Sequence, residues 1–481
     1  MMKLLLFISL FNLVFSGYLF NPENTSLSGA SSIAFDDFRS MNPATMASHK
    51  GFTIKLLGAS YGVGNNFLSI SNYNDINGAN FEDPTASKYF SKSEFYSFFN
   101  EGIRLNGQIA LNLPFSDIIY NNISFSSKTY FMLDAHIPKS CVELILYGNE
   151  LNKAYDFSLN NSINIFSESS IGYAQSFNSF SLGMRFKYLQ GLAYGEFINL
   201  SDNSSYFYTD STGFIGKAEY LINQGIGGSG FSFDIGVIYK KSQSDWKVGV
   251  SLNNLFGKIK WDDNNFTYNS LRDLIEEKLP LRHNEKQYFS INLDTLNAMN
   301  MLDMSLDEIY TTESFPVIEF HNLDDIPFNT DSLLNNNLLI LTEYGSYLLK
   351  SEELEDNVIR AMDLNVRDRI TTYPSYFNLS FQKTLEDDID FCISLSTGFS
   401  NSLRNSEQWN LSTGLLFNRF KNIPITIGIS LGGTEKISSG FSIGYKKGPI
   451  LINYGLKIRD GIFIQSMQGL DLSATLLLNI K

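Results

Sequence analysis

Cysteine and long apolar runs are scarce in this chain of 481 residues. The chain has only two cysteines, Cys141 and Cys392, whereas small secreted domains held by disulfides are rich in cysteine. Its one long apolar run, from Leu4 to Phe15, is shorter than the ~20 residues that a membrane-spanning helix needs. The mature fold is therefore expected to depend on burial or on strand closure, without a helical membrane span.

An excess of basic residues is also missing. The chain carries 36 basic and 50 acidic residues, a net charge of −14. Residues 294–369 hold 16 acidic and 4 basic residues, so this acidic block accounts for −12 and the remainder is nearly neutral. Proteins that bind nucleic acid usually carry a basic stripe, so a nucleic-acid partner is excluded.

The N-terminus has the pattern of a secretory signal peptide. Lys3 precedes the apolar run, and the small residues Val14 and Ser16 occupy the two positions that a signal peptidase reads. The alternative, a membrane anchor, would need a longer run. We therefore predict export, with residues 1–16 removed before Gly17.

Alternation of apolar and polar residues dominates the rest of the chain and is clearest from Phe231 to Asn253. One side of this hairpin is apolar and the other is mostly small or polar, as expected when strand side chains alternate between two faces. Similar stretches recur through residues 51–293 and 370–481, about fourteen strands in all. The acidic block interrupts them as a long, partly helical insertion. The apolar face includes Phe231, Phe233, Ile235, Val237, Tyr239, Trp246, Val248, Val250 and Leu252.

Four short segments have helical patterns instead. Leu27, Ala30, Ile33, Ala34 and Phe38 predict an amphipathic helix in residues 17–50 that Asn42-Pro43 ends. A second helix is predicted to start at Pro138 and stop at Gly148-Asn149, with Cys141, Leu144 and Ile145 on one face. A third is predicted over Ser270–Leu279, with Ser270 as N-cap. A fourth, capped by Ser351, is predicted in the acidic block.

Two architectures suit this pattern. A secreted β-sandwich would hide its apolar faces against each other, whereas a transmembrane antiparallel β-barrel would turn them toward lipid. The stretches are long for a sandwich, the polar face has the small residues of a lumen, and the last strand reaches the C-terminus and could close on the first. These features favour the barrel.

The segment before the first strand resembles the N-terminus of the outer-membrane long-chain fatty-acid transporter superfamily. The similarity lies in Ser28-Gly29-Ala30-Ser31-Ser32-Ile33-Ala34-Phe35-Asp36-Asp37 and in Asn42-Pro43-Ala44-Thr45-Met46-Ala47. The order of elements resembles uncharacterised Bacteroidota-type outer-membrane barrels related to the type IX secretion shuttle protein. One departure is the ending Asn479-Ile480-Lys481, where many such barrels end on an aromatic residue.

This resemblance implies a barrel with residues 17–50 folded inside as a helical hatch, to which Asp36, Asp37, Asn42 and Pro43 would belong. It also implies a hydrophobic ligand that binds in the lumen and leaves sideways through a kinked strand. The strand pattern itself places a set of charged residues on the lumen face, namely Arg104, Arg185, Lys187, Asp234 and Lys247. Whether these charges tune passage or simply pair with each other is left open.

The sequence predicts no catalytic residues, metal or cofactor. Gly225–Gly230 matches a dinucleotide-binding string, but a strand follows it instead of a helix, so we interpret it as a flexible turn. The four histidines are scattered, and no serine accompanies His136 and Asp134. The acidic block lacks a calcium-loop motif.

Three functions are therefore carried forward. The first is a barrel of the bacterial outer membrane, in contact with its lipid, that passes a hydrophobic or small solute. The second is a barrel that serves as a platform for a surface or secretion partner. The third is a secreted β-sandwich adhesin.

Overall fold

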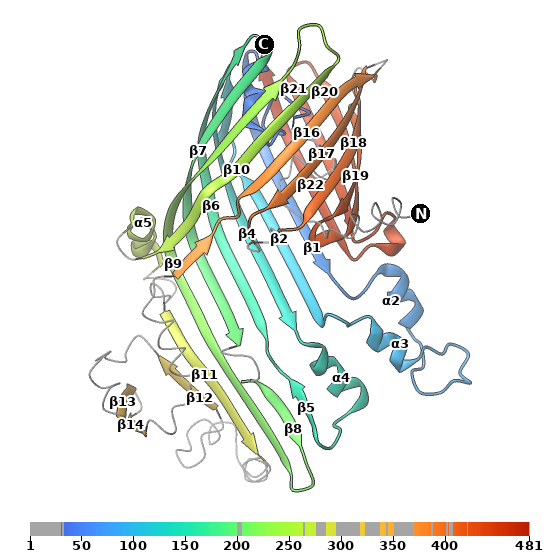
Figure 1. Ribbon diagram of the computed structural model, residues 1–481, viewed down its shortest axis with the longest axis vertical. Coiled ribbons are helices and arrows are strands. Elements are labelled where there is room, and N and C mark those ends of the chain that lie inside the picture. Colours follow the sequence, from blue (N-terminus) through green and yellow to red (C-terminus); the bar gives the residue numbers. More distant parts are fainter. Residues whose placement is uncertain are drawn as a thin grey trace, which may run out of the picture.

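The computed structural model describes residue 30 and residues 33–199, 204–262, 265–275, 285–294, 318–322, 337–342, 345–350, 369–385, 388–400, 403, 407–420 and 422–480. Within these residues, antiparallel strands form one closed ring (Figure 1). The fold is a transmembrane antiparallel β-barrel of fourteen strands, and the sandwich alternative is wrong. Its strands are β1 (Phe52–Asn65), β2 (Ile103–Asn112), β4 (Ile123–Ile137), β6 (Asn160–Phe177), β7 (Phe180–Asn199), β9 (Phe214–Tyr239), β10 (Trp246–Trp261), β16 (Tyr376–Leu385), β17 (Ile389–Gly398), β18 (Trp409–Phe417), β19 (Ile425–Gly432), β20 (Ile437–Lys447), β21 (Ile450–Arg459) and β22 (Gly469–Ile480).

The ring closes between the first and last strands. β1 pairs with β2 on one side and with β22 on the other, from Phe52↔Ile480 to Gly64↔Gly469. The expectation that the C-terminal strand closes on the first is confirmed. Closure leaves the ring with no open sheet edge, which is why strands can cross a lipid bilayer.

Side chains alternate between the two surfaces of this ring. On β9, Phe231, Phe233 and Ile235 point outward and are about half exposed, while Ser232 and Asp234 point inward and are buried. The outward face is apolar and the inward face is small, polar or charged, as in membrane barrels. The alternation is the physical reason that the sequence pattern identified the strands and their two faces.

The two ends of the barrel differ. At the end that holds the start of β1 and the end of β22, short turns join the strands, for example Tyr120 to Ile123 and Lys447 to Ile450. We call this the short-turn end and the opposite end the long-loop end. The long-loop end carries three short helices, α2 (Ile70–Ile76), α3 (Lys92–Ser97) and α4 (Lys139–Tyr147), and two short 3₁₀ turns, η5 (Gly433–Glu435) and η6 (Ile464–Ser466).

The wall of the barrel is interrupted in two places. β3 (Asp117–Tyr120) continues β2 along β1 after a break at residues 113–116, where β1 itself has a bulge. β15 (Arg369–Thr372) and β16 likewise form one course along β10, broken at residues 373–375. Both breaks redirect backbone away from the regular ladder.

Three neighbouring strands continue far beyond the rest of the ring. β6, β7 and β9 have 18, 20 and 26 residues, whereas strands β16 to β22 have 8 to 12. A membrane crossing needs only about 9–11 residues. The excess projects from the long-loop end (Figure 1). There β9 pairs with β8 (Tyr206–Thr209) and with β11 (Glu285–Asp294). β5 (Lys153–Asp156) pairs with β8, and β12 (Ile318–Asn322) pairs with β11.

The acidic block begins where β11 ends. Its described residues form strands, namely β12 and the hairpin of β13 (Asn337–Thr342) and β14 (Gly345–Lys350). The helix predicted after Ser351 lies outside the described residues.

The predictions for the helices α4 and α5 need refinement. α4 spans Lys139–Tyr147 between Pro138 and Gly148, as predicted, but its buried residues are Cys141 and Val142, and Ile145 is 82% exposed. The third helix, α5 (Phe266–Ile275), begins five residues before the predicted start. Its N-cap is Asn265, whose Oδ1 accepts a hydrogen bond from the Tyr268 amide, because an asparagine fits that role as well as a serine.

The predicted N-terminal helix is wrong for the described residues. Residues 33–42 form turns and bends, and the regular element is a 3₁₀ helix, η2 (Pro43–Ser48). Asn42 and Pro43 start this helix instead of ending one. The Asn42 side chain accepts the Ala44 amide, and proline at the first helical position has no amide that needs a partner.

The glycine run Gly225–Gly230 is also not a turn, because it lies inside β9. A side chain at Gly228 would meet Trp261, and one at Gly227, where φ is +73°, would meet Tyr268 of α5. Neighbouring residues thus occupy the space that side chains at Gly227 and Gly228 would need. Among the described residues, no helix is long and apolar enough to cross a membrane.

Candidate functional site

The N-terminal segment, residues 33–50, lies in the lumen of the barrel. Phe38 packs against Ile119, Leu451 and Leu477, which point inward from β3, β21 and β22. On other strands, Ile33 packs with Ile238 of β9. Contacts with strands on different sides of the ring show that the segment crosses the lumen near the short-turn end.

Glycines on the barrel wall form a seat for this segment. Gly183 of β7 and Gly236 of β9 are direct partners in the ladder, and Gly249 lies on the adjoining strand β10. A side chain at Gly236 would overlap the Asn42 amide, and one at Gly183 would overlap the backbone of Pro43 and Ala44. The missing side chains allow the backbone of the segment to approach the wall.

Asn42 is the residue that fastens the segment into this glycine seat. Its Oδ1 accepts the Ala44 amide at 2.9 Å, which caps η2. Its Nδ2 donates to the carbonyls of Val250 at 3.0 Å and Val237 at 3.3 Å. One side chain that is 1% exposed therefore joins the segment to two barrel strands.

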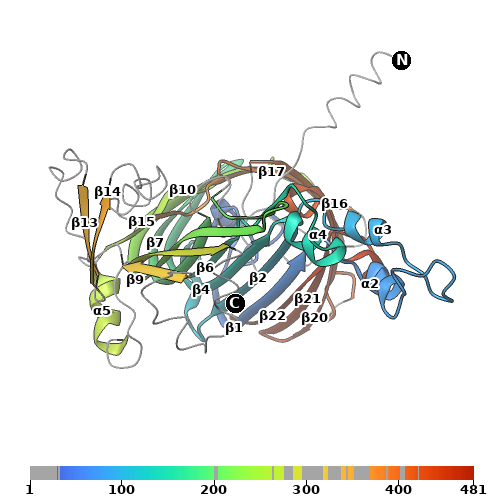
Figure 2. The same ribbon diagram turned by 90° about the horizontal axis from the view of Figure 1, so that it is seen from below.

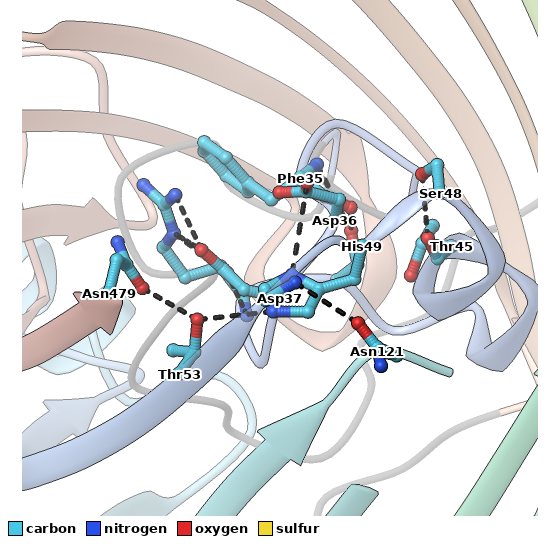
Figure 3. A network of polar contacts seen from close by, with 12 residues as sticks. Phe35, Asp36, Asp37, Thr45, Ser48, His49, Thr53, Asn121 and Asn479 are labelled. Atoms are coloured by element: carbon cyan, nitrogen blue, oxygen red, sulfur yellow. Dashed lines mark hydrogen bonds and ion pairs between the residues drawn. The ribbon is translucent and has the colours of Figure 1, made fainter. Parts of the chain in front are cut away.

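A polar network holds the end of the segment at the short-turn mouth (Figure 3). Thr53 Oγ1 donates to Asn479 Oδ1 at 2.7 Å and lies 3.2 Å from His49 Nε2. The Gly51 amide donates to Asn121 Oδ1 at 3.2 Å. The segment is thus tied to the first strand, the last strand and the turn between β3 and β4.

Asp37 organises the turn that precedes η2. Arg39 donates to both carboxylate oxygens of Asp37, and the Arg39 amide donates to Oδ1 at 3.0 Å (Figure 3). Burial by itself would raise the pKa of Asp37, but the Arg39 charge and hydrogen bonds outweigh it and lower the pKa below its ordinary value. Asp36 is different: its side chain is 55% exposed and lies 3.9 Å from His49.

A cluster of charges occupies the lumen beyond the seat. Lys187 Nζ lies 3.0 Å from Asp234 and 3.4 Å from Glu168, and it donates to Asn254 Oδ1 at 2.6 Å. Arg185 lies 3.2 Å from Asp234. Each buried charge has a partner of opposite sign, which offsets the cost of removing it from water.

A small polar cavity of about 50 Å³ lies between this cluster and the N-terminal segment. Phe38, Ser40 and Met41 line it from the segment, and Glu168, Arg185 and Asp234 line it from the wall. A water needs roughly 10–15 Å³ on this measure, so the cavity holds only a few waters. This cavity has no room for a larger molecule.

Beyond the cavity, toward the long-loop end, an apolar cluster fills the lumen. Tyr373 leaves the broken strand between β15 and β16, its hydroxyl donates to Glu168, and its ring packs on Phe166. Trp261 is 1% exposed and donates to Thr371 Oγ1 at 2.9 Å. The buried members are Ala110, Tyr130, Met132, Phe166, Leu189, Tyr194, Ile259, Trp261 and Tyr373.

The structure brings together only part of the charged set that the sequence placed in the lumen. Arg185, Lys187 and Asp234 are neighbours in the charge cluster. Arg104 lies near the long-loop rim in a pair with Asp134, and Lys247 lies on β10 close to the short-turn end, outside the cluster.

Sequence reasoning missed Glu168 and Tyr373. It did not identify β6 as a strand, although Ile171 and Tyr173 point outward and Ser170 and Gly172 inward, as in the other strands. This alternation was the available signal for Glu168. No such alternation marks Tyr373, because it lies in the break between β15 and β16, where the backbone leaves the regular strand. In the described part of the chain, no group of histidine, cysteine or acidic side chains could hold a metal ion.

Comparison with protein families identifies one relationship. The model of a family of unknown function, DUF5723, matches residues 43–315, which is more than half of the chain. The chain belongs to this family. The matched range begins at Pro43, so it includes η2, the glycine seat and the charge cluster. A comparison with curated proteins found no match.

Solved structures with a similar course of the chain include three bacterial proteins. A FadL homologue of Pseudomonas aeruginosa has 11% identity and a TM-score of 0.44, with 97% of this chain and all of that chain covered. The toluene transporter TbuX of Ralstonia pickettii has 10% identity and a TM-score of 0.44, covering 98% and 100%. The toluene transporter TodX of Pseudomonas putida has 9% identity and a TM-score of 0.46, covering 98% and 99%. At this level of similarity they indicate nothing about the solute of this protein.

Proposed function

We propose that this protein is a channel of a bacterial outer membrane, through which a hydrophobic or small solute passes when the N-terminal segment leaves the glycine seat. The observation that carries the proposal is the seat itself. Side-chain hydrogen bonds, apolar contacts and a glycine-lined notch hold the segment in the lumen. The segment adds no strand to the ring, so it can leave the lumen while the ring of strands stays intact.

The cavity beneath the segment supports a closed resting state. The cavity of about 50 Å³ is too small for a solute of toluene size. The apolar cluster lies in the lumen beyond it. Passage therefore requires displacement of residues 33–50, whose contacts with the wall make them a hatch in our proposal. Asp37 shapes the hatch, and Asn42 and Pro43 fasten it.

The break between β15 and β16 is our candidate for a side exit. Asn254 and Tyr373 line the cavity and also belong to the interrupted part of the wall, where Asn254 donates to the Pro374 carbonyl at 2.9 Å. The outward side of this region carries Phe256, which is 82% exposed. A solute that reaches the cavity would be separated from lipid by few side chains.

The test loosens the hatch without changing the barrel. Replacing Asn42 with alanine removes a helix cap, worth about 1 kcal/mol, and two hydrogen bonds, worth about 1 kcal/mol each. We expect higher conductance in planar bilayers and faster swelling of proteoliposomes in a small sugar than with the unchanged protein. The matched control is Gly195→Ala, since a Cβ at Gly195 meets nothing within 4 Å. If Asn42→Ala makes the segment accessible to protease but leaves both the conductance and the proteoliposome result unchanged, the channel proposal fails.

A second candidate function is a platform for a surface or secretion partner. The extended strands β6, β7 and β9 favour it, because they stand beyond the membrane and β9 pairs there with β11, at whose end the acidic block begins. In outer-membrane barrels the longer loops usually face outside the cell. Replacing residues 297–368 with a short linker should then remove binding to the partner and leave solute entry unchanged. Loss of solute entry in this variant would instead count against a separate platform role.

A further inference from the structure

Outward-facing aromatic rings mark two levels on the barrel wall. At the short-turn end, Tyr239 lies 5.0 Å from Phe180 and 5.8 Å from Trp246, centroid to centroid. Farther along the same strand, Phe231 lies 5.3 Å from Tyr188 and 5.4 Å from Phe186. Aromatic rings concentrate at the two interfaces of a membrane barrel.

The separation of these levels fits the apolar part of a membrane. Tyr239 and Phe231 are eight residues apart on β9. At ~3.3 Å per residue and a tilt of ~40°, eight residues rise about 20 Å, close to the ~25 Å apolar band of such barrels. The level of Tyr188 and Phe231 is therefore near the interface on the long-loop side.

Helix α5 is fastened to the outside of the barrel at this second level. Tyr188, whose ring faces outward, has its hydroxyl 3.4 Å from Thr267 Oγ1. Asn265 Nδ2 donates to the Gly227 carbonyl at 2.9 Å, and Tyr268 fills the space that a side chain at Gly227 would take. Figures 1 and 2 show α5 outside the ring beside β9, on the side away from α2, α3 and α4.

The two sides of the first turn of α5 differ in exposure. Thr267 is 3% exposed against the barrel, whereas Phe266 is 71% exposed, and Asn269 and Ser270 are exposed as well. The exposed phenylalanine continues the outward apolar surface of β7 and β9. Short amphipathic helices with such residues lie in the plane of a membrane interface.

We infer that α5 is an interfacial helix that rests on the membrane leaflet of the long-loop side, with Phe266 at the boundary between headgroups and acyl chains. The partner is lipid, because the surface around α5 is the lipid-facing belt of the barrel. The helix fixes the depth at which β10 ends and β11 departs toward the acidic block. This role is independent of whether the lumen passes a solute.

The test measures depth in the membrane directly. Full-length protein with Phe266→Cys is labelled with the fluorophore NBD and reconstituted into liposomes of phosphatidylcholine and phosphatidylglycerol. Some liposomes carry phosphatidylcholine with a doxyl quencher near the headgroup, others with one near the chain end. We expect strong quenching by the shallow quencher, weaker quenching by the deep one, and protection from iodide in the water.

The natural cysteines should stay unlabelled. Cys141 and Cys392 are buried, and burial raises the pKa of the Cys141 thiol to about 11, so little reactive thiolate forms at neutral pH. Unchanged protein serves to check this. Heat-modifiable mobility on a gel shows that each variant retains a folded barrel.

The matched control is Ile145→Cys on α4, an apolar helical residue that is 82% exposed but lies farther from the short-turn end than α5 (Figure 1). Its label should be quenched by iodide and not by either lipid. Ser270→Cys gives a second measurement on the exposed side of α5. Labels at 266 and 270 that behave like the label at 145, in folded protein, would overturn the inference.

Discussion

Single glycines decide how close the N-terminal segment comes to the wall of the barrel. At Gly183 and Gly236 the backbone of the segment occupies the space where a side chain would stand. Other glycines on the same strands face open space, such as Gly195. Gly183 and Gly195 therefore have different roles although both lie on β7. The composition of the chain does not reveal this difference.

The first prediction concerns this seat. Gly236→Val should displace Asn42 and release the segment, because the new side chain overlaps the Asn42 amide. Limited trypsin digestion of the folded protein in detergent should then cut after Arg39, whose side chain is now only 16% exposed. The control Gly195→Val should remain protected. Equal protection of both variants would show that the wall can absorb the extra side chain.

The second prediction concerns pH. Because the folded pKa of Asp37 is lowered, its bond to Arg39 stabilises the seated segment fully above the ordinary value of 3.8, and this contribution is lost as the pH falls below that value. Pepsin should therefore cut residues 33–50 increasingly as the pH is lowered through this acid range. With digestion times scaled to the activity of pepsin at each pH, Asp37→Asn should be cut to a similar extent throughout, since it has no charge to lose. A parallel pH profile for both proteins would contradict this role of Asp37.

At the scale of elements, a buried ion pair between β21 and β22 is linked by a hydrogen bond to β2, which is distant in the sequence. Arg459 of β21 is 1% exposed, donates to Asp471 of β22 and donates to Asn106 of β2 at 2.9 Å. A side chain at Gly62 of β1 would overlap this pair. The pair thus joins the strands on both sides of the closure between β1 and β22.

The third prediction compares this pair with an exposed one. Arg459→Ala leaves the buried Asp471 carboxylate without its partner and should lower the free energy of unfolding by ~3–5 kcal/mol. Arg104→Ala breaks a pair with Asp134 in which Arg104 is 57% exposed, and should cost less than ~1 kcal/mol. Urea unfolding of the barrel in detergent micelles measures both. Replacing Arg459 and Asp471 together with Met and Leu should recover most of the loss, and failure to recover it would mean that packing, not charge, is decisive.

At the scale of the whole molecule, the ring closes without the acidic block. All fourteen strands of the ring lie in residues 52–261 and 376–480, and β11 and β15 lie on either side of residues 295–368. The extended strands rise beyond the membrane, and β11, which pairs with one of them, β9, leads into that block. The ring of strands should therefore form without the acidic block.

The fourth prediction follows from this separation. A variant in which a flexible linker replaces residues 297–368 should fold into a barrel that still needs detergent, resists carbonate extraction from outer membranes and shifts its gel mobility on boiling. Closure leaves no unpaired strand edge, which is the reason for such resistance. A variant that is soluble without detergent, or that shows no shift on boiling, would mean that the block takes part in forming the ring.

The sequence by itself determined the strands and their two faces, because the alternation of apolar and polar residues is carried by each strand. Alternation along Phe231–Tyr239 or Ile425–Leu431 is a local property and needs no knowledge of neighbours. The start and stop of α4 were also local, since Pro138 and Gly148 act on their own backbone.

Tertiary structure alone decided how the lumen is filled. Asn42-Pro43 reads locally as the end of a helix, but its partners are carbonyls on β9 and β10, nearly two hundred residues away or more. Gly225–Gly230 reads as a turn, but Trp261 and Tyr268 occupy the space beside it. Glu168, Lys187 and Asp234 meet because the strands β6, β7 and β9 adjoin, and Tyr373 joins them from the break between β15 and β16. Those contacts exist only when the strands are paired, so no single stretch of sequence contains them.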